Sequence, residues 1–157
     1  MVLTTLRNRF LQDKIYTASG DIIIAVNPYK RITPLYSKEN LKLYLTSTDV
    51  NIDAIAVAPS PSEGEKLDPH VYVVARNAYS KMEAEFKNQG VIISGESGAG
   101  KTEVTKICLN YISMRSTQKK GADDISLEEE GVAAGLEKRL LSANPVFEAF
   151  GNAKTTR

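Results

Sequence analysis

The sequence predicts an α/β fold of the P-loop NTPase type, with a partial sheet flanked by helices in an incomplete domain. A short β-branched run, residues 91–93 (VII), leads into the pattern Gly95-x-x-x-x-Gly100-Lys101-Thr102. This pattern requires a strand before it and a helix after it, and an apolar helix face does follow. Only roughly four strands can be assigned, fewer than an open sheet covered by helices on both faces is expected to have.

Composition indicates an ordinary globular chain. The 157 residues suffice for one domain, with 42% hydrophobic and 25% charged residues. The net charge of +1 gives no reason to expect a nucleic-acid partner. The longest apolar run, residues 22–26, is too short for a transmembrane helix, and residues 1–6 do not resemble a signal peptide. Because Cys108 and His70 are the only cysteine and histidine, an internal disulfide and a zinc site are excluded, and a reduced cytoplasmic setting is expected.

A helix and a β-hairpin are predicted first along the chain. Residues 3–11 carry a short apolar helical face. Residues 14–18 are typical of a strand, a Ser-Gly turn follows, and residues 21–26 are typical of a second strand. The second strand is apolar on both faces, so we expect it deep in a covered sheet. It ends before Pro28, which cannot donate to a ladder.

The next segment holds an irregular loop, a short helix and a longer excursion. Residues 27–36 (NPYKRITPLY) contain two prolines and two tyrosines, and spacing alone does not separate a binding loop from a surface connection. Ser37 is expected to cap a helix that runs through Leu45. Residues 46–66 are rich in turn formers and predict a surface excursion, with residues 51–57 as a candidate strand.

A longer helix is predicted to begin at Asp68-Pro69, with Asp68 as the N-cap and Pro69 at the first helical position. Its apolar face continues from Val71 to Phe86. His70 lies at the start of this helix, where a structural or capping role is expected rather than catalysis.

The pattern at residues 95–102 suits the phosphates of a nucleoside triphosphate. Its glycines let the backbone curl close to an anion without Cβ clashes, and the inward N–H groups form an anion nest at the positive end of a helix dipole. Lys101 is predicted to be the catalytic cation on the β- and γ-phosphates, and the Thr102 hydroxyl to bind Mg²⁺. The predicted phosphate-binding residues are Gly95, Glu96, Ser97, Gly98, Ala99, Gly100, Lys101 and Thr102.

Beyond the P-loop, an apolar helix face recurs at helical spacing. Its members are Val104, Ile107, Cys108, Tyr111 and Ile112. Residues 116–131 are rich in charge and predict a flexible loop. Helical patterns resume at residues 132–141 and after Pro145. No predicted strand ends in a convincing acidic residue, so no second Mg²⁺ ligand is identified.

Together these motifs resemble the N-terminal part of the myosin motor domain. Residues 95–103 read GESGAGKTE, the myosin version of the P-loop, and residues 25–30 (AVNPYK) are similar to the myosin purine-binding loop. Residues 69–79 (PHVYVVARNAY) resemble the helix before the P-loop, and residues 143–155 (ANPVFEAFGNAKT) are similar to the segment leading into switch I. The four stretches follow the family's order across nearly the whole chain.

The resemblance implies further roles. It implies a purine-binding loop at residues 27–36, a variable loop near the nucleotide entrance at residues 116–131 and a segment before switch I at residues 143–157. The residues that it places on the adenine side are Asn27, Pro28, Lys30 and Tyr36, with Glu103 nearby. It implies ATP and Mg²⁺ as cofactors and an actin-activated ATPase in the full-length motor. Actin filaments, and light chains or calmodulin on a lever, would be partners, and the actin cytoskeleton of the cytoplasm would be the location.

Some positions depart from the family pattern. Val104 stands where the family usually has asparagine, Ser142 and Phe147 also differ, and residues 46–66 are longer than the usual connection. These departures predict a divergent, unconventional class. Because family motors carry both switches and the actin site beyond position 157, these residues alone are expected to bind nucleotide without fast hydrolysis. The alternatives are a non-catalytic nucleotide-binding or scaffold fragment, and another P-loop NTPase such as a small-molecule kinase.

Overall fold

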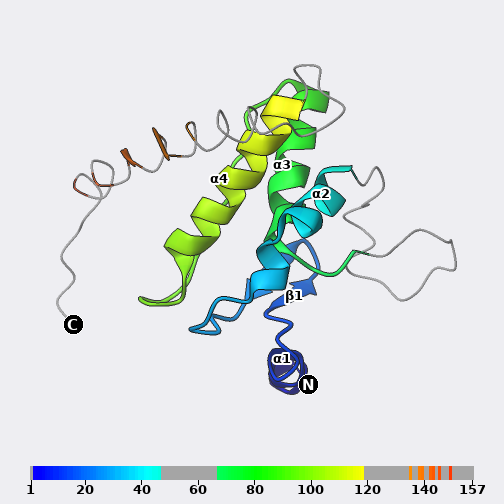
Figure 1. Cartoon of the computed structure of the whole chain (residues 1–157), viewed down its shortest axis with the longest axis vertical. Coiled ribbons are helices and arrows are strands. Elements are labelled where there is room, and N and C mark those ends of the chain that lie inside the picture. The colour runs from blue at the N-terminus through cyan, green and yellow to red at the C-terminus, as the bar shows by residue number, and fades with distance from the viewer. Residues whose placement is uncertain are drawn as a thin grey trace, which may run out of the picture.

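The computed structural model describes residues 2–46 and 67–118, together with seven single positions between residues 135 and 149. In chain order the elements are α1 (Val2–Phe10), β1 (Tyr16–Ser19), β2 (Ile22–Ala25), the 3-10 helix η1 (Thr33–Tyr36), α2 (Lys38–Thr46), α3 (Val71–Glu85) and α4 (Lys101–Gln118) (Figure 1). The candidate strand at residues 51–57 lies outside the described residues, and so does most of the sequence from residue 119 onward. None of the described helices has both the length and the hydropathy needed to cross a membrane.

The core lies where α3 and α4 pack side by side, with α2 and the start of β1 against them (Figure 1). Its buried apolar residues are Ile15, Tyr16, Tyr44, Leu45, Val71, Tyr72, Val73, Ala75, Cys108, Tyr111 and Met114. Two hydrogen bonds join α4 to the end of α2. The Tyr111 hydroxyl donates to the Tyr44 carbonyl at 3.1 Å, and Arg115 Nη1 donates to the Leu45 carbonyl at 3.2 Å. They satisfy carbonyls that the last turn of a helix leaves unpaired.

The predicted hairpin is confirmed. β1 and β2 pair antiparallel, with Tyr16 opposite Ala25 and Ser19 opposite Ile22. Gly20 turns the chain at a φ of +57°, a conformation that favours glycine. The expectation that β2 is deeply covered is wrong, because Ile22 is 61% exposed. In the described residues the sheet has only these two strands, and the side chains of β2 are half-buried or exposed.

The helix starts follow the prediction in one case and correct it in the other. Ser37 caps α2 as expected, since its Oγ accepts from the Asn40 N–H at 3.1 Å. α3 begins at Val71, and its N-cap is His70 rather than Asp68. His70 Nδ1 accepts from the Tyr72 N–H at 3.1 Å, which confirms a capping role. The Asp68 carbonyl instead accepts from the Tyr44 hydroxyl at 2.7 Å, so tertiary packing holds this residue before the helix.

Two helix ends also differ from the prediction. Phe86 does not extend the apolar face of α3, because it takes a left-handed conformation at the C-cap (φ +53°) and is 94% exposed. The helix after the P-loop runs to Gln118, so the predicted loop at residues 116–131 begins too early. The Thr117 hydroxyl donates to the Ser113 carbonyl one turn back, at 2.9 Å, inside the continuing helix.

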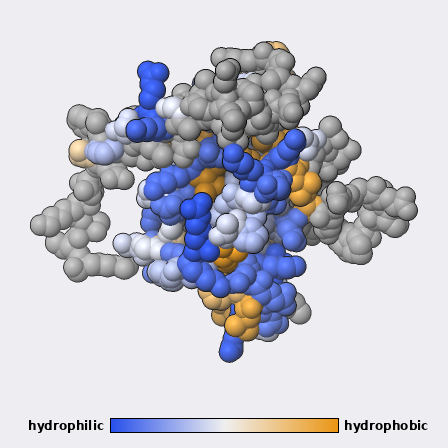
Figure 2. Space-filling model, viewed as in Figure 1, coloured by the Kyte–Doolittle hydropathy of each residue, from blue (hydrophilic) through white to orange (hydrophobic). Residues whose placement is uncertain are grey.

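Apolar side chains remain visible between polar ones on one face of the molecule (Figure 2). At the end where α1 lies, Val2 is 66% exposed and Leu3 is 81% exposed. No residue of α1 is buried. The predicted apolar helix is therefore present, but its apolar side chains lie outside the core.

Candidate functional site

The approach to the P-loop does not form the predicted strand. Residues 86–96 carry no strand or helix, and Ile92 is 93% exposed. A strand is stabilised by hydrogen bonds to a neighbouring strand, and no other described segment pairs with residues 91–94. The predicted open α/β sheet is therefore not seen in the described part of the chain.

The P-loop has the predicted turn and helix start. Gly98 and Gly100 have φ values of +79° and +95°, which glycine adopts readily and other residues rarely do. The Ala99 N–H donates to the Glu96 carbonyl at 3.2 Å and closes the turn. A Cβ on Gly95 would lie 3.1 Å from the Ala99 Cβ, closer than packed carbon atoms normally approach. The chain thus curls tightly and enters α4 at Lys101.

The Lys101 side chain reaches back over the loop. Its Nζ donates to the Gly95 carbonyl at 2.7 Å and to the Glu96 carbonyl at 2.8 Å. An ammonium group has three donors, so one remains for an anion. The nearest carboxylate along the helix, Glu103, is paired instead with Lys106 Nζ at 2.7 Å. Among the described residues no carboxylate is ion-paired with Lys101, so its positive charge is available to an anion at the P-loop.

Thr102 lies in the first turn of α4 and is exposed. Its hydroxyl could serve as a single oxygen ligand to a hard cation that is otherwise bound by phosphates and water, which is the usual coordination of Mg²⁺. In residues 2–46 and 67–118 no three His, Cys, Asp or Glu side chains gather as a metal site. Glu96 and Ser97 are likewise exposed on the loop.

Asn27 connects the P-loop to residues 27–36, which contain two prolines and are called the proline-rich loop from here on. Its Nδ2 donates to the Gly98 carbonyl at 2.8 Å, and its Oδ1 accepts from the Tyr29 N–H at 2.9 Å. A Cβ on Gly100 would lie 3.8 Å from the same Nδ2. Asn27 and the half-buried Pro28 beside it are thus brought to the edge of the phosphate loop.

The other residues predicted to lie on the adenine side do not contact the P-loop through the bonds seen for Asn27; they have partners elsewhere. Lys30 Nζ pairs with Asp13 Oδ1 at 2.6 Å, and both side chains are more than half exposed. The hydroxyls of Tyr36 and Tyr16 are hydrogen-bonded at 2.8 Å. Burial, with a smaller effect of the Tyr36 hydroxyl, raises the pKa of the Tyr16 phenol above its usual range, so the phenol stays neutral. Roles for Lys30, Tyr36 and Glu103 at an adenine ring stay predictions.

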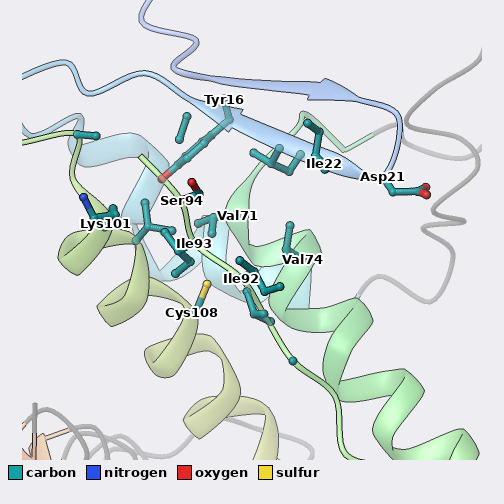
Figure 3. A pocket seen from close by; sticks show the side chains of 16 residues that line it. Tyr16, Asp21, Ile22, Val71, Val74, Ile92, Ile93, Ser94, Lys101 and Cys108 are labelled. Atoms are coloured by element: carbon teal, nitrogen blue, oxygen red, sulfur yellow. The ribbon is translucent and has the colours of Figure 1, made fainter. Parts of the chain in front are cut away.

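A cavity of about 300 Å³ adjoins the P-loop. It lies between β2, α3, residues 90–94 and the start of α4. Figure 3 shows Lys101 at one end and the Asp21 carboxylate turned away from the other labelled side chains. Most of its lining is apolar and includes the Cys108 side chain, whose burial raises the pKa of the thiol to about 11. Such a lining does not suit phosphates, so the cavity lies beside the anion site.

A buried histidine among tyrosines is the feature that the sequence did not predict. His70 is 1% exposed, and four tyrosine rings lie around it, with centroid distances between 4.2 and 5.8 Å. We name this set the tyrosine cage. It consists of Tyr16, Tyr36, Tyr44 and Tyr72. Burial lowers the pKa of His70 to about 4, with a small opposing effect of the Leu35 carbonyl. The cage residues come from separate elements at no regular spacing, so no sequence pattern reveals them.

Comparison with known proteins gives a consistent result. Residues 1–157 match the sequence profile of the family described as "Myosin head (motor domain)". The chain is 40% identical over 154 residues to unconventional myosin-IXa of Mus musculus, covering 98% of this chain and 5% of that protein. It is 38% identical over 156 residues to myosin-52 of Schizosaccharomyces pombe, covering 99% of this chain and 9% of that protein. It is 40% identical over 156 residues to the myosin IC heavy chain of Dictyostelium discoideum, covering 99% of this chain and 11% of that protein.

Proposed function

Because the chain belongs to the myosin head (motor domain) family, we propose that it forms the ATP-binding part of an actin-based motor. In that motor, hydrolysis of Mg-ATP would be coupled to movement along actin filaments. The observation that carries the proposal is the Lys101 ammonium held over a tight glycine loop at the N-terminus of α4. This is an anion-binding arrangement with a free donor and the positive end of a helix dipole.

The residues present fit ATP and Mg²⁺. Gly98 and Gly100 take the left-handed φ values that a tight anion-binding loop uses. Lys101 would bind the β- and γ-phosphates, and Thr102 would contribute its hydroxyl to Mg²⁺. The metal would supply positive charge against the charge that develops on the transferred phosphoryl group. Glu96, Ser97 and Ala99 would complete the loop around the phosphates.

The base would lie on the side of residues 27–36. The support is the hydrogen bond from Asn27 to the Gly98 carbonyl, which puts this loop next to the phosphate site. Pro28, Lys30 and Tyr36 would line that side, and Glu103 would lie nearby. A P-loop NTPase-type α/β fold is part of the proposal. Its support is the family match, together with the helix that begins directly after the glycine loop.

Actin activation, lever-bound light chains and a cytoplasmic location also belong to this proposal. They rest on the family, because the chain spans 5% to 11% of the length of the relatives described above. A scaffold fragment or another P-loop NTPase is less favoured, because the family match extends over all 157 residues.

Binding of Mg-ATP by the purified full-length protein that carries this sequence tests the nucleotide site. Lys101→Ala should weaken the affinity at least tenfold, since it removes a charge-assisted contact of about 1.5–3 kcal/mol. Lys81→Ala is the matched control, because Lys81 is an exposed lysine on α3 and should leave the affinity within about twofold. Equal affinities of Lys101→Ala and wild type would refute the P-loop assignment.

Cosedimentation with filamentous actin tests the motor assignment separately. The full-length protein should pellet with actin and be released by Mg-ATP. Protein that binds Mg-ATP but never pellets with actin would contradict the motor proposal. It would favour the alternative of a non-catalytic nucleotide-binding or scaffold protein.

A further inference from the structure

His70 lies at a junction of four elements. The tyrosines around it come from β1, η1, α2 and α3. The ring centroid of His70 lies 4.7 Å from that of Tyr16 and 5.8 Å from that of Tyr36, both in edge-on geometry. Edge-to-face contacts at these distances are attractive beyond the area that they bury. The imidazole therefore contacts both η1 and the start of β1, whose two tyrosines are also joined directly by their hydroxyls.

The proline-rich loop at residues 27–36 is attached at both of its ends. At its start, Asn27 donates to the P-loop carbonyl of Gly98. At its end, Tyr36 is hydrogen-bonded to Tyr16 and contacts the His70 ring. Between these attachments Tyr29 is 86% exposed, with a φ of +51°. The position of the loop thus depends on the tyrosine cage at one end and on the phosphate site at the other.

We propose that His70 is a positioning residue for the base side of the nucleotide site, which holds the 27–36 loop against the P-loop through the tyrosine cage. This inference rests on the proposed function, because it concerns how the same site distinguishes a nucleotide from bare phosphates. His70 contacts neither the P-loop nor the exposed part of the loop, so it acts through Tyr36 and Tyr16. The hydrogen bonds within the P-loop, from the Ala99 N–H and from Lys101 Nζ, do not involve His70.

The two ring nitrogens show why a histidine suits this position. Nδ1 accepts from the Tyr72 N–H and caps α3, which holds the ring in one orientation. Nε2 is buried and has no hydrogen-bond partner among the described residues. The Leu35 carbonyl in η1 accepts from Asn40 Nδ2 at 2.7 Å. The cap on α3 and the ring contact with Tyr36 thus link α3 to the end of the loop.

His70→Asn separates the cap from the ring. Asparagine is a good N-cap, so its side-chain oxygen can replace Nδ1 as acceptor for the Tyr72 amide. The amide is smaller than imidazole and leaves the tyrosines without their central contact, so the end of the loop at Tyr36 can shift into the vacated space. ATP is bound through both its base and its phosphates, whereas pyrophosphate is bound through phosphates alone. The proposal therefore predicts selective loss of ATP affinity.

The experiment measures dissociation constants of the full-length protein for Mg-ATP and for Mg-pyrophosphate by calorimetry. For His70→Asn we expect ATP to bind about tenfold more weakly, the effect of one or two lost aromatic contacts, with pyrophosphate within about twofold of wild type. Tyr16→Phe removes the hydroxyl bond to Tyr36 but keeps the ring, and should give a smaller selective loss of ATP. Met114→Ala is the control for general core damage, because Met114 is 7% exposed and lies far along α4 from the loop. It should not change the ratio of the two constants.

Each outcome decides the inference. An unchanged ratio in His70→Asn, whether both ligands weaken equally or neither does, would overturn it. If His70→Asn binds neither ligand because it fails to fold, the Tyr16→Phe ratio decides in the same way. Wild-type protein that binds pyrophosphate but not ATP would overturn the proposed function together with the inference. Wild-type protein that binds both, with an unchanged ratio in the variants, would overturn the inference alone.

Discussion

Acidification should loosen the start of α3 because His70 is buried in its neutral form. Burial lowers the pKa of His70 from 6.5 to about 4 in the folded chain. Between these values the unfolded chain binds a proton that the folded chain does not, so the free energy of unfolding rises with pH in this window. The stabilisation is complete above about pH 6.5 and is lost as the pH falls toward 4. Protonation of Nδ1 also removes the acceptor that the Tyr72 N–H uses.

The size of the effect follows from the shift in pKa. At 1.36 kcal/mol per pKa unit, the lowering corresponds to about 3 kcal/mol between the two limits, of which about 2 kcal/mol is expressed between pH 7 and pH 4.5. Amide hydrogen exchange reports local opening directly. After correction for intrinsic exchange rates, the peptide that contains the Tyr72 and Val73 amides should exchange about 30-fold faster at pH 4.5 than at pH 7.

The His70→Asn variant separates the contribution of the histidine to the pH dependence of exchange from that of the carboxylates, which titrate in the same pH range. In that variant the same peptide should lose most of the pH dependence attributed to His70, whereas acidic groups elsewhere act equally on both proteins. If the corrected exchange rates of this peptide in wild type and variant keep the same ratio from pH 7 to pH 4.5, His70 is not neutral and buried, and the assignment is refuted.

Three further effects are expected. Tyr111→Phe removes the hydroxyl that donates to the Tyr44 carbonyl and should lower the free energy of unfolding by about 1 kcal/mol in urea titrations, without changing nucleotide affinity. A neutral effect would show that this hydrogen bond contributes no net stability. Gly98→Ala places a side chain at a φ of +79° and should weaken pyrophosphate binding several-fold through a strain of about 1–2 kcal/mol, whereas Gly90→Ala, with open space around its Cβ, should not. Because burial raises the pKa of the Cys108 thiol to about 11, the thiol should react with disulfide reagents at pH 8 only after urea is added, and rapid reaction of the native protein would contradict its burial.

The local patterns of the sequence predicted those parts of the site that depend on neighbouring residues. The hairpin with Gly20 at its turn, the glycine loop and the helix that begins at Lys101 all follow from backbone preferences within a few positions. The apolar face of α4 follows from helical spacing, and Cys108 and Tyr111 on it are indeed buried. The family resemblance, read from motifs in order, is confirmed over the whole chain.

Contacts between distant positions were decided only by the tertiary structure. Asn27 lies 71 residues before the glycine whose carbonyl it binds, and no spacing rule connects them. Local rules made Asp68 the N-cap of α3, but the aromatic packing around His70 placed the cap two residues later. Apolar runs predicted buried strands at β2 and before the P-loop, yet Ile22 and Ile92 are largely exposed. The apolar composition of a segment sets the free energy that its burial would contribute. Whether the segment is buried depends on which other segments pack against it.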